Sequence, residues 1–370
     1  MRFAAAIITI SFTLVSSATA ALTAGFNATA DYQVVLDTPT GALGRTLAFD
    51  PVSNQLLVGN IGEPNIYCFN AATGGTGSPV TLNNGAFVPV DPNRNLPYFG
   101  VGATASGEIY SFQNDTDENG TPGDQVIRWA NVNAVPAAAG SPLATLESSI
   151  HFPRNISLYQ AVNTDYYVEV GAFDAIVASQ AINIWAYDGV TFSLADQITD
   201  GLASPGGAPE GKSGAALDGF PPRYALGAET VGTNGAHLWE NTAYPAFPGT
   251  WQFVGTLENT FTAKCADVAF DTDLQSPDER PLMFAFHCDG ARAVVNMYLL
   301  GQTSIFASFE ADLSSVVLLD NAGGGLELDT ENNIAYFGNR PSTAPSDFFV
   351  CRVGYTPPVT TDVREFATYR

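Results

Sequence analysis

A short acidic loop is the most specific arrangement of potential metal ligands in the sequence. Oxygen-bearing side chains recur at alternate positions, Asp115, Asp117 and Asn119, and are followed by Gly120 and by Asp124. Calcium prefers several carboxylate and amide oxygens, and a glycine lets the chain turn tightly around the ion. The glutamate that a complete helix–loop–helix calcium loop carries at its twelfth position is missing. We therefore expect a structural calcium site here; the alternative is an acidic hairpin loop without a metal.

A second group of candidates consists of carboxylates, amides, imidazoles and one guanidinium in segments that we expect to form loops at one face of the molecule. Such groups can line a ligand pocket, and around a metal ion they can activate water for attack on a lactone or ester. These candidate ligand-face residues are Glu63, Asn65, His151, Asp174, Glu229, His287, Asp289, Asn339 and Arg340.

The three histidines of the chain, His151, His237 and His287, could in principle form a zinc site with one open position. They are far apart in sequence and show no short ligand spacing, so packed or surface histidines are the simpler interpretation. The chain has no Gly-x-Ser-x-Gly sequence, which disfavours a serine hydrolase of that type.

Composition excludes several classes of protein. The 370 residues are 46% hydrophobic and include 35 Gly and 23 Pro, with only 14% charged residues. This composition argues against wholesale disorder and against a long coiled coil. The chain has only 14 basic residues (Lys and Arg) but 37 acidic ones, which gives a net charge of -23. Nucleic acid is therefore not an expected partner, because binding phosphates requires a basic surface.

The first twenty residues have the features of a secretory signal peptide. Arg2 precedes an apolar stretch from Phe3 to Val15, and Ala18-Thr19-Ala20 forms a small-residue cleavage site. The apolar stretch is too short to be a comfortable membrane anchor. We expect residues 1–20 to be removed and residues 21–370 to form a single secreted, extracellular domain with no membrane span.

Four cysteines in an oxidising compartment predict disulfides. Their number allows three pairings. We favour Cys265–Cys288 within one structural repeat, which leaves Cys68–Cys351 between the first and last repeats. In a eukaryotic host the mature chain would be a glycoprotein, with acceptor sequences at Asn27, Asn114, Asn119 and Asn155.

An internal repeat organises the chain. Four segments share an apolar strand ending in Asp, a turn, a second apolar strand and a Gly nine residues after the Asp. The pairs are Asp50/Gly59, Asp91/Gly100, Asp218/Gly227 and Asp329/Gly338, with looser copies around Asp271 and before Gly171. We interpret each Asp as a turn residue whose side chain hydrogen-bonds the turn backbone.

Further strand-like runs complete each repeat. Third strands are expected at 66–69, 109–112, 182–187, 237–239, 294–298 and 348–353, and fourth strands at 192–198, 251–257, 304–309 and 365–369. Six units of about four strands, none able to bury both faces alone, predict an all-β fold: a six-bladed β-propeller of four-stranded antiparallel blades. The segment 32–37 is a candidate for completing the last blade. Seven blades, a sandwich or a solenoid are the alternatives.

The segments LAFDPVSNQLLVGN (47–60) and IYCFNAATG (66–74) resemble blades of the NHL-repeat and senescence-marker-protein (gluconolactonase-like) propellers. In the gluconolactonase-like family, a glutamate at the start of the first inner strand helps to hold a divalent metal on the axis. Here the segment GALGRTLAFD (41–50) has Arg45 and contains no carboxylate before Asp50, so the chain departs from the family at that ligand.

These features lead to two functional hypotheses. The first is a secreted, non-catalytic propeller that binds an extracellular protein or glycan through its loop face. The alternative is a metal-dependent lactonase or hydrolase whose carboxylates and amides converge on the propeller axis. Because propellers support both roles, the fold alone does not choose between them.

Overall fold

Runs of branched and aromatic residues alternate with short turn segments in the sequence. In the computed structural model, the described runs form strands. The structure describes residues 24–38, 44–60, 65–75, 80–82, 100–113, 124–134, 144–146, 156–161, 163–171, 181–199, 214–228, 235–260, 264–319, 324–343 and 347–359. These residues contain strands β1 to β25 and no helix. Accordingly, no helix in these ranges is long and apolar enough to cross a membrane.

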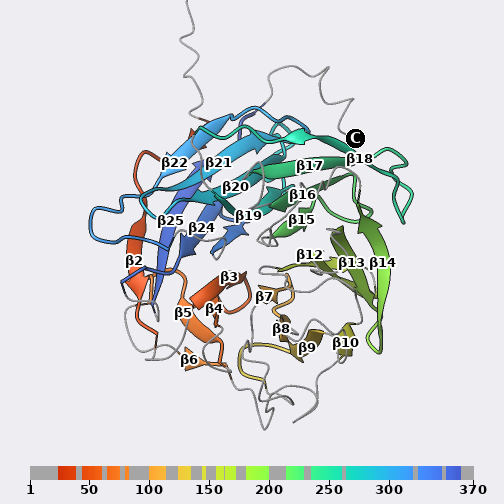
Figure 1. The fold of residues 1–370 in the computed structure, drawn as a ribbon, viewed down its shortest axis with the longest axis horizontal. Coiled ribbons are helices and arrows are strands. Elements are labelled where there is room, and N and C mark those ends of the chain that lie inside the picture. The colour runs from red at the N-terminus through yellow and green to blue at the C-terminus, as the bar shows by residue number, and fades with distance from the viewer. Residues whose placement is uncertain are drawn as a thin grey trace, which may run out of the picture.

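The strands form six antiparallel sheets arranged radially around one axis (Figure 1). The prediction of an all-β, six-bladed propeller is therefore confirmed.

We number the blades in chain order. Blade 1 contains β3 (Gly44–Asp50), β4 (Gln55–Asn60), β5 (Tyr67–Asn70) and β6 (Val80–Thr81). Blade 2 contains β7 (Gly100–Ala103), β8 (Ile109–Gln113), β9 (Asp124–Trp129) and β10 (Ala144–Leu146). Blade 3 contains β11 (Ile156–Ala161), β12 (Thr164–Gly171), β13 (Ala181–Tyr187) and β14 (Phe192–Ile198).

The last three blades follow the same plan, with the first strand of each nearest the axis. Blade 4 contains β15 (Ala215–Leu217), β16 (Tyr224–Ala228), β17 (Ala236–Asn241) and β18 (Trp251–Thr256). Blade 5 contains β19 (Lys264–Asp271), β20 (Leu282–Cys288), β21 (Ala293–Leu299) and β22 (Ala307–Glu310). Blade 6 contains β23 (Gly325–Asp329), β24 (Ile334–Asn339) and β25 (Phe348–Thr356).

The N-terminal segment completes blade 6, as the sequence predicts. Strand β2 (Tyr32–Leu36) lies antiparallel to β25, with Val34 opposite Val350. Strand β1 (Gly25–Phe26) pairs with the end of the same strand. The first and last parts of the chain therefore share one sheet, and their backbone hydrogen bonds close the ring.

The hydrophobic core lies between the blades. The buried apolar side chains of the described residues form six clusters, each between two neighbouring blades. One of them joins blade 6 to blade 1 through Tyr336 and Phe49, whose rings stack 5.2 Å apart. Burying a large side chain contributes about 1.5–3 kcal/mol, so each blade depends on both neighbours for its stability.

Hydrogen bonds between inner strands add to this packing. Ser157 Oγ donates to the Ala215 carbonyl oxygen at 2.6 Å, joining blades 3 and 4. The Leu326 amide donates to Asp267 Oδ2 at 2.8 Å, joining blades 5 and 6.

The aspartates of the repeat are turn residues, as predicted. Asp50 Oδ1 accepts the Val52 amide at 3.0 Å, and Asp218 Oδ1 accepts two amides of its turn at 2.8 and 2.9 Å. Asp329 Oδ1 likewise accepts the Asn332 amide at 3.2 Å. Asp91 lies outside the described residues. We call the face that carries these first hairpins the turn face, and the opposite face the loop face.

The predicted strand order of blade 2 is wrong by one strand. The repeat places the inner strand at 88–91 and the third strand at 109–112. In the structure the inner strand is β7, and residues 109–113 form the second strand, β8. The turn between them has no aspartate: Thr104 Oγ1 accepts the Glu108 amide at 3.1 Å instead. In this turn a threonine hydroxyl therefore accepts a backbone amide, as the aspartate carboxylates do in the other repeats.

The two predicted disulfides are not formed. All four cysteines lie in the described part of the chain and are buried thiols. Within blade 5, Cys265 packs toward blade 4, whereas Cys288 packs toward blade 6. Cys68 packs toward blade 2 and Cys351 toward blade 5, so these two side chains point away from each other. Burial raises the pKa of Cys68 to about 12, which disfavours its reactive thiolate.

Candidate functional site

Most candidate residues of the loop face lie outside the described residues. These are the loop positions Asp115, Asp117 and Asn119, and the ligand-face positions Glu63, His151, Asp174 and Glu229. Asp124 is the first residue of β9 and pairs through its backbone with Leu146, and Asn65 lies two residues before β5. The calcium loop and the axial carboxylate site therefore stay predictions.

The two described histidines do not share a site. His237 Nδ1 lies 3.0 Å from Thr256 Oγ1, on the side of blade 4 that packs against blade 3. His287 lies on β20 and is fully buried toward blade 4, where its Nδ1 is 3.0 Å from Asn259 Nδ2. Blade 4 separates the two imidazoles, so they cannot be ligands of one zinc ion.

The other described candidates have structural contacts. Asp289 Oδ1 accepts the amides of Ala291 and Arg292 at 3.0 and 2.7 Å, which makes it a turn residue. Asn339 is fully buried and donates to the Leu319 carbonyl oxygen at 3.1 Å. Arg340 is half-buried, and burial lowers the pKa of its guanidinium. Among the described residues, no three His, Cys, Asp or Glu side chains converge on one point.

A cavity of about 130 Å³ lies on the axis, between the inner strands. Its lining is largely aliphatic but includes Ser157, Tyr159 and the carboxyl group of Glu327. Burial raises the pKa of Glu327 well above its ordinary value, and the nearby charge of Asp267 raises it further. No side-chain hydrogen bond or ion pair of Glu327 is present within the described ranges, so this acid is costly to ionise in the folded protein.

A second, more polar cavity lies on the turn face, at the junction of blades 2 and 3. Its volume is about 270 Å³. The two hairpins of blade 3 supply most of its wall, and β9 of blade 2 supplies one guanidinium. The polar residues that line it are Arg128, Gln160, Asn163, Thr164, Asp165, Tyr187 and Asp188. We call this cavity the blade 2–3 pocket.

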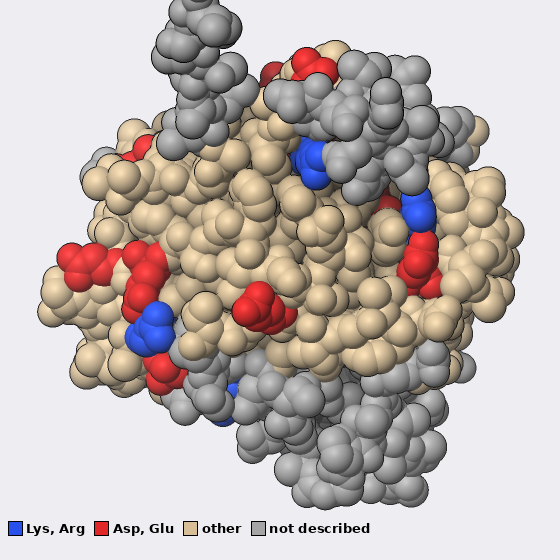
Figure 2. Space-filling view, turned by 90° about the horizontal axis from the view of Figure 1, so that it is seen from above, with Lys and Arg blue, Asp and Glu red and all other residues tan. Residues whose placement is uncertain are grey.

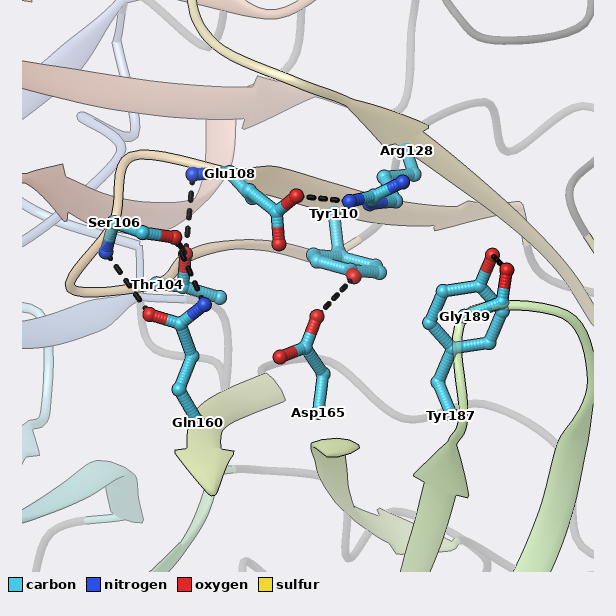
Figure 3. A network of polar contacts seen from close by, with 9 residues as sticks. All are labelled: Thr104, Ser106, Glu108, Tyr110, Arg128, Gln160, Asp165, Tyr187 and Gly189. Atoms are coloured by element: carbon cyan, nitrogen blue, oxygen red, sulfur yellow. Dashed lines mark hydrogen bonds and ion pairs between the residues drawn. The ribbon is translucent and has the colours of Figure 1, made fainter. Parts of the chain in front are cut away.

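A hydrogen-bond network fixes the walls of the blade 2–3 pocket (Figure 3). Glu108 forms an ion pair with Arg128, and the Tyr110 hydroxyl donates to Asp165 Oδ2 at 2.7 Å. Gln160 is oriented by Ser106, whose amide donates to Gln160 Oε1 at 3.1 Å.

Further contacts fix the ring of Tyr187 and the turn that follows it. The guanidinium carbon of Arg128 lies 5.9 Å from the ring centroids of both Tyr110 and Tyr187. The Tyr187 hydroxyl donates to the Gly189 carbonyl oxygen at 2.9 Å. The polar groups are therefore positioned before any ligand arrives.

The electrostatics of the pocket follow from this geometry. Burial raises the pKa of Glu108, and Asp165 raises it further, while Arg128 acts in the opposite direction. Tyr110 and Glu108 raise the pKa of Arg128 against the effect of burial, so its positive charge is retained. Backbone amides of Thr191 and Val190 lower the pKa of the exposed Asp188. The pocket therefore combines the guanidinium of Arg128 with the carboxyl groups of Asp165 and Asp188 in its lining, and Glu108 lies behind the guanidinium.

Sequence reasoning missed the blade 2–3 pocket for two reasons. Its residues come from four strands of two blades and the turns next to them, and the charged ones, Arg128, Asp165 and Asp188, are far apart in the sequence. It also lies on the turn face, whereas ligands were expected on the loop face. The one available signal was Arg128, a base within a strand of a chain that has only 14 bases.

The face of the described residues that Figure 2 shows has no strong charge pattern. In the view of Figure 2, acidic side chains form small separate groups, basic ones are fewer, and most of the visible described surface is neither.

Comparisons with known proteins support the fold. No family model matches the sequence, and no curated protein matches it. A calcium-binding protein, regucalcin, from Agrobacterium tumefaciens strain C58 is 13% identical, with 91% of this chain and 97% of that chain covered and a TM-score of 0.51. A gluconolactonase from Xanthomonas campestris is 9% identical, with 88% of this chain and 99% of that chain covered and a TM-score of 0.50.

At these identities the likeness concerns the fold alone. It supports the resemblance to gluconolactonase-like propellers that the blade pattern indicated. Activity, metal and ligand have to be argued from this chain's own residues.

Proposed function

We propose that the protein is a secreted, non-catalytic β-propeller that binds an extracellular glycan. The observation that favours a glycan over a protein partner is the blade 2–3 pocket, which is concave and lined by prearranged polar groups. Sugar hydroxyls are recognised by carboxylates, amides and guanidinium groups held in fixed orientations. The predicted signal peptide supports an extracellular ligand.

The size of the pocket narrows the proposal. Its 270 Å³ lies just below the range of about 300–1,000 Å³ that is usual for drug-sized ligands. A single sugar ring, terminal or branching, is therefore a better match than a long chain segment. The propeller contributes rigidity, because neighbouring blades are packed and hydrogen-bonded around the pocket.

Filling the pocket tests this proposal. Ala161 lines it, and we expect Ala161→Trp to abolish binding on a glycan array on which the mature wild-type protein gives specific signals. Ala243→Trp places the same ring in an exposed turn of blade 4 and should leave the signals unchanged. Equal signals from the wild type and Ala161→Trp would refute a role for the pocket. Absence of any glycan signal, together with metal-dependent turnover of lactones, would favour the alternative of a lactonase.

A structural calcium ion in the 115–124 loop is part of the proposal. Regucalcin is described as a calcium-binding protein, and this loop has the alternating oxygen ligands that calcium prefers. We expect millimolar calcium to raise the melting temperature of the mature protein relative to a chelator, and Asp117→Asn to remove most of that difference. Asp312→Asn, in an exposed turn of blade 5, is the control. A melting temperature that does not respond to calcium would eliminate the site.

A further inference from the structure

We propose that the blade 2–3 pocket selects a sugar that carries a protonated primary amine, as in a glucosamine residue without its N-acetyl group. This inference rests on the proposed glycan-binding function and names the class of glycan. The inference follows from the charged side chains that line the cavity and from the ion pair and hydrogen bonds that these side chains already form.

The positive charge of the pocket is already neutralised. Among the described residues, Arg128 is the one base that lines the cavity, and it forms an ion pair with Glu108 behind the wall. Two further carboxylates, Asp165 and Asp188, line the same cavity from the two hairpins of blade 3. Neither forms an ion pair with a base within the described residues. The open side of the pocket therefore carries excess negative charge.

The two aspartates differ in how they are held. One oxygen of Asp165 accepts the Tyr110 hydroxyl, and the carboxyl group also interacts with that of Glu108. Asp188 is fixed in its turn by the amides of Val190 and Thr191 at 2.9 and 2.8 Å. Both carboxylates are thus prearranged, so little ordering entropy is lost when they bind an ammonium group.

The remaining groups of the pocket fit the rest of a sugar ring. Gln160 is locked by two hydrogen bonds to Ser106, and the side chains of Asn163 and Thr164 also line the cavity. Amides and hydroxyls can donate to and accept from ring hydroxyls. A bare metal ion would leave these groups unused. An acidic sugar would place its carboxylate against Asp165 and Asp188.

Three chemically matched oligosaccharides test the inference by calorimetric titration of the mature protein. The probes are tetramers of glucosamine, of N-acetylglucosamine and of glucose, which share the ring and differ at one substituent. We expect the glucosamine tetramer to bind at least about tenfold more tightly than the other two, because a charge-assisted hydrogen bond replaces a neutral one. Its affinity should fall as salt is raised, since part of the pocket is exposed.

Two variants locate the effect. Asp165→Asn should remove most of the preference for the amine, and Asp188→Asn, which is exposed, should reduce it about threefold. Asp312→Asn removes a carboxylate from a similar exposed turn in blade 5 and should change nothing. Melting curves check that each variant is folded. If Asp165→Asn does not fold, the effect of Asp188→Asn on the preference for glucosamine still tests the inference.

The outcomes separate this inference from the proposed function. Equal binding of the three tetramers, or a preference for the acetylated one, overturns the selection of an amine and leaves glycan binding intact. Failure of every oligosaccharide on the array and in the titrations overturns both. A preference for glucosamine that survives both aspartate substitutions also overturns the inference, because the charge would then act elsewhere.

Discussion

Replacing Gly338 with alanine should remove most of the stability of the protein. Gly338 lies on β24, and a Cβ atom there would be 1.9 Å from the Phe349 carbonyl oxygen and 3.0 Å from Val350 Cα on β25. Both atoms belong to the backbone, so no side-chain movement relieves the clash. Strands β24 and β25 would have to separate in the blade that closes the ring. We expect a loss of about 4 kcal/mol or more, measured by urea denaturation.

A glycine at the equivalent position of blade 4 provides the control. Gly227 also stands nine residues after a turn aspartate, but a Cβ atom there would meet only the tips of Ile182 and Trp239, at 3.1 Å. These side chains can shift, so Gly227→Ala should cost only about 1 kcal/mol. Equal losses for the two variants would show that the clash in blade 6 is relieved in a way the structure does not indicate.

Replacing Glu327 with glutamine should stabilise the protein at pH 8. The carboxyl group lines the axial cavity, and burial, reinforced by Asp267, raises its pKa. At pH 8 the folded protein must either keep a proton that the unfolded chain releases or hold a buried negative charge. Glutamine avoids both costs, so we expect a gain of about 1–3 kcal/mol in the free energy of unfolding.

The sign of the pH dependence follows from the same shift. A carboxyl group whose pKa is higher in the folded than in the unfolded state contributes stability that is complete below its unfolded pKa of about 4. That contribution is lost as the pH rises through the folded pKa. Burial raises the pKa of Asp218 and of Asp271 to about 6, so both add to the trend between about pH 4 and pH 6. The wild type should therefore melt at a lower temperature at pH 8 than at pH 5.

Glu327→Gln should flatten this dependence, and the exposed Glu331 in the following turn provides the control. Melting curves at half-unit pH intervals measure both variants. Glu331→Gln should retain the wild-type slope. If Glu327→Gln retains it as well, the axial carboxyl group is solvated or paired in solution and the prediction is wrong.

Much of the fold was predictable because the repeat depends on local turn chemistry. Asp50, Asp218 and Asp329 hydrogen-bond the turn that follows them, and that requirement appears in the sequence at fixed spacing. Blade 2 was misassigned because Thr104 performs the same task with a hydroxyl. A rule written in terms of one residue type fails where another side chain makes the same hydrogen bond.

The candidate site and the cysteine pairs were not predictable from local spacing. Arg128 and Asp165 come from different blades, and which groups face each other there depends on how two sheets pack. Whether Cys265 and Cys288 can form a disulfide depends on the face of the blade 5 sheet on which each side chain lies. Residue Cys265 pairs with His287, so Cys288 is offset by one position. An offset of one reverses the face of a strand, and sequence separation alone does not reveal it.

The pairing of β2 with β25 makes the final step of folding dependent on an intact chain. Strand β2 precedes the whole of blade 1, yet its partner, Phe348–Thr356, is synthesised after all the other strands of the described residues. Blades 1 to 5 can build up in the order in which they emerge, but the closing sheet has to wait for the last one. A polypeptide truncated before β25 would keep an unpaired edge on β2 and an uncovered apolar surface on blade 1. Closure of the ring through this sheet therefore requires both strands, although they lie more than 300 residues apart in the sequence.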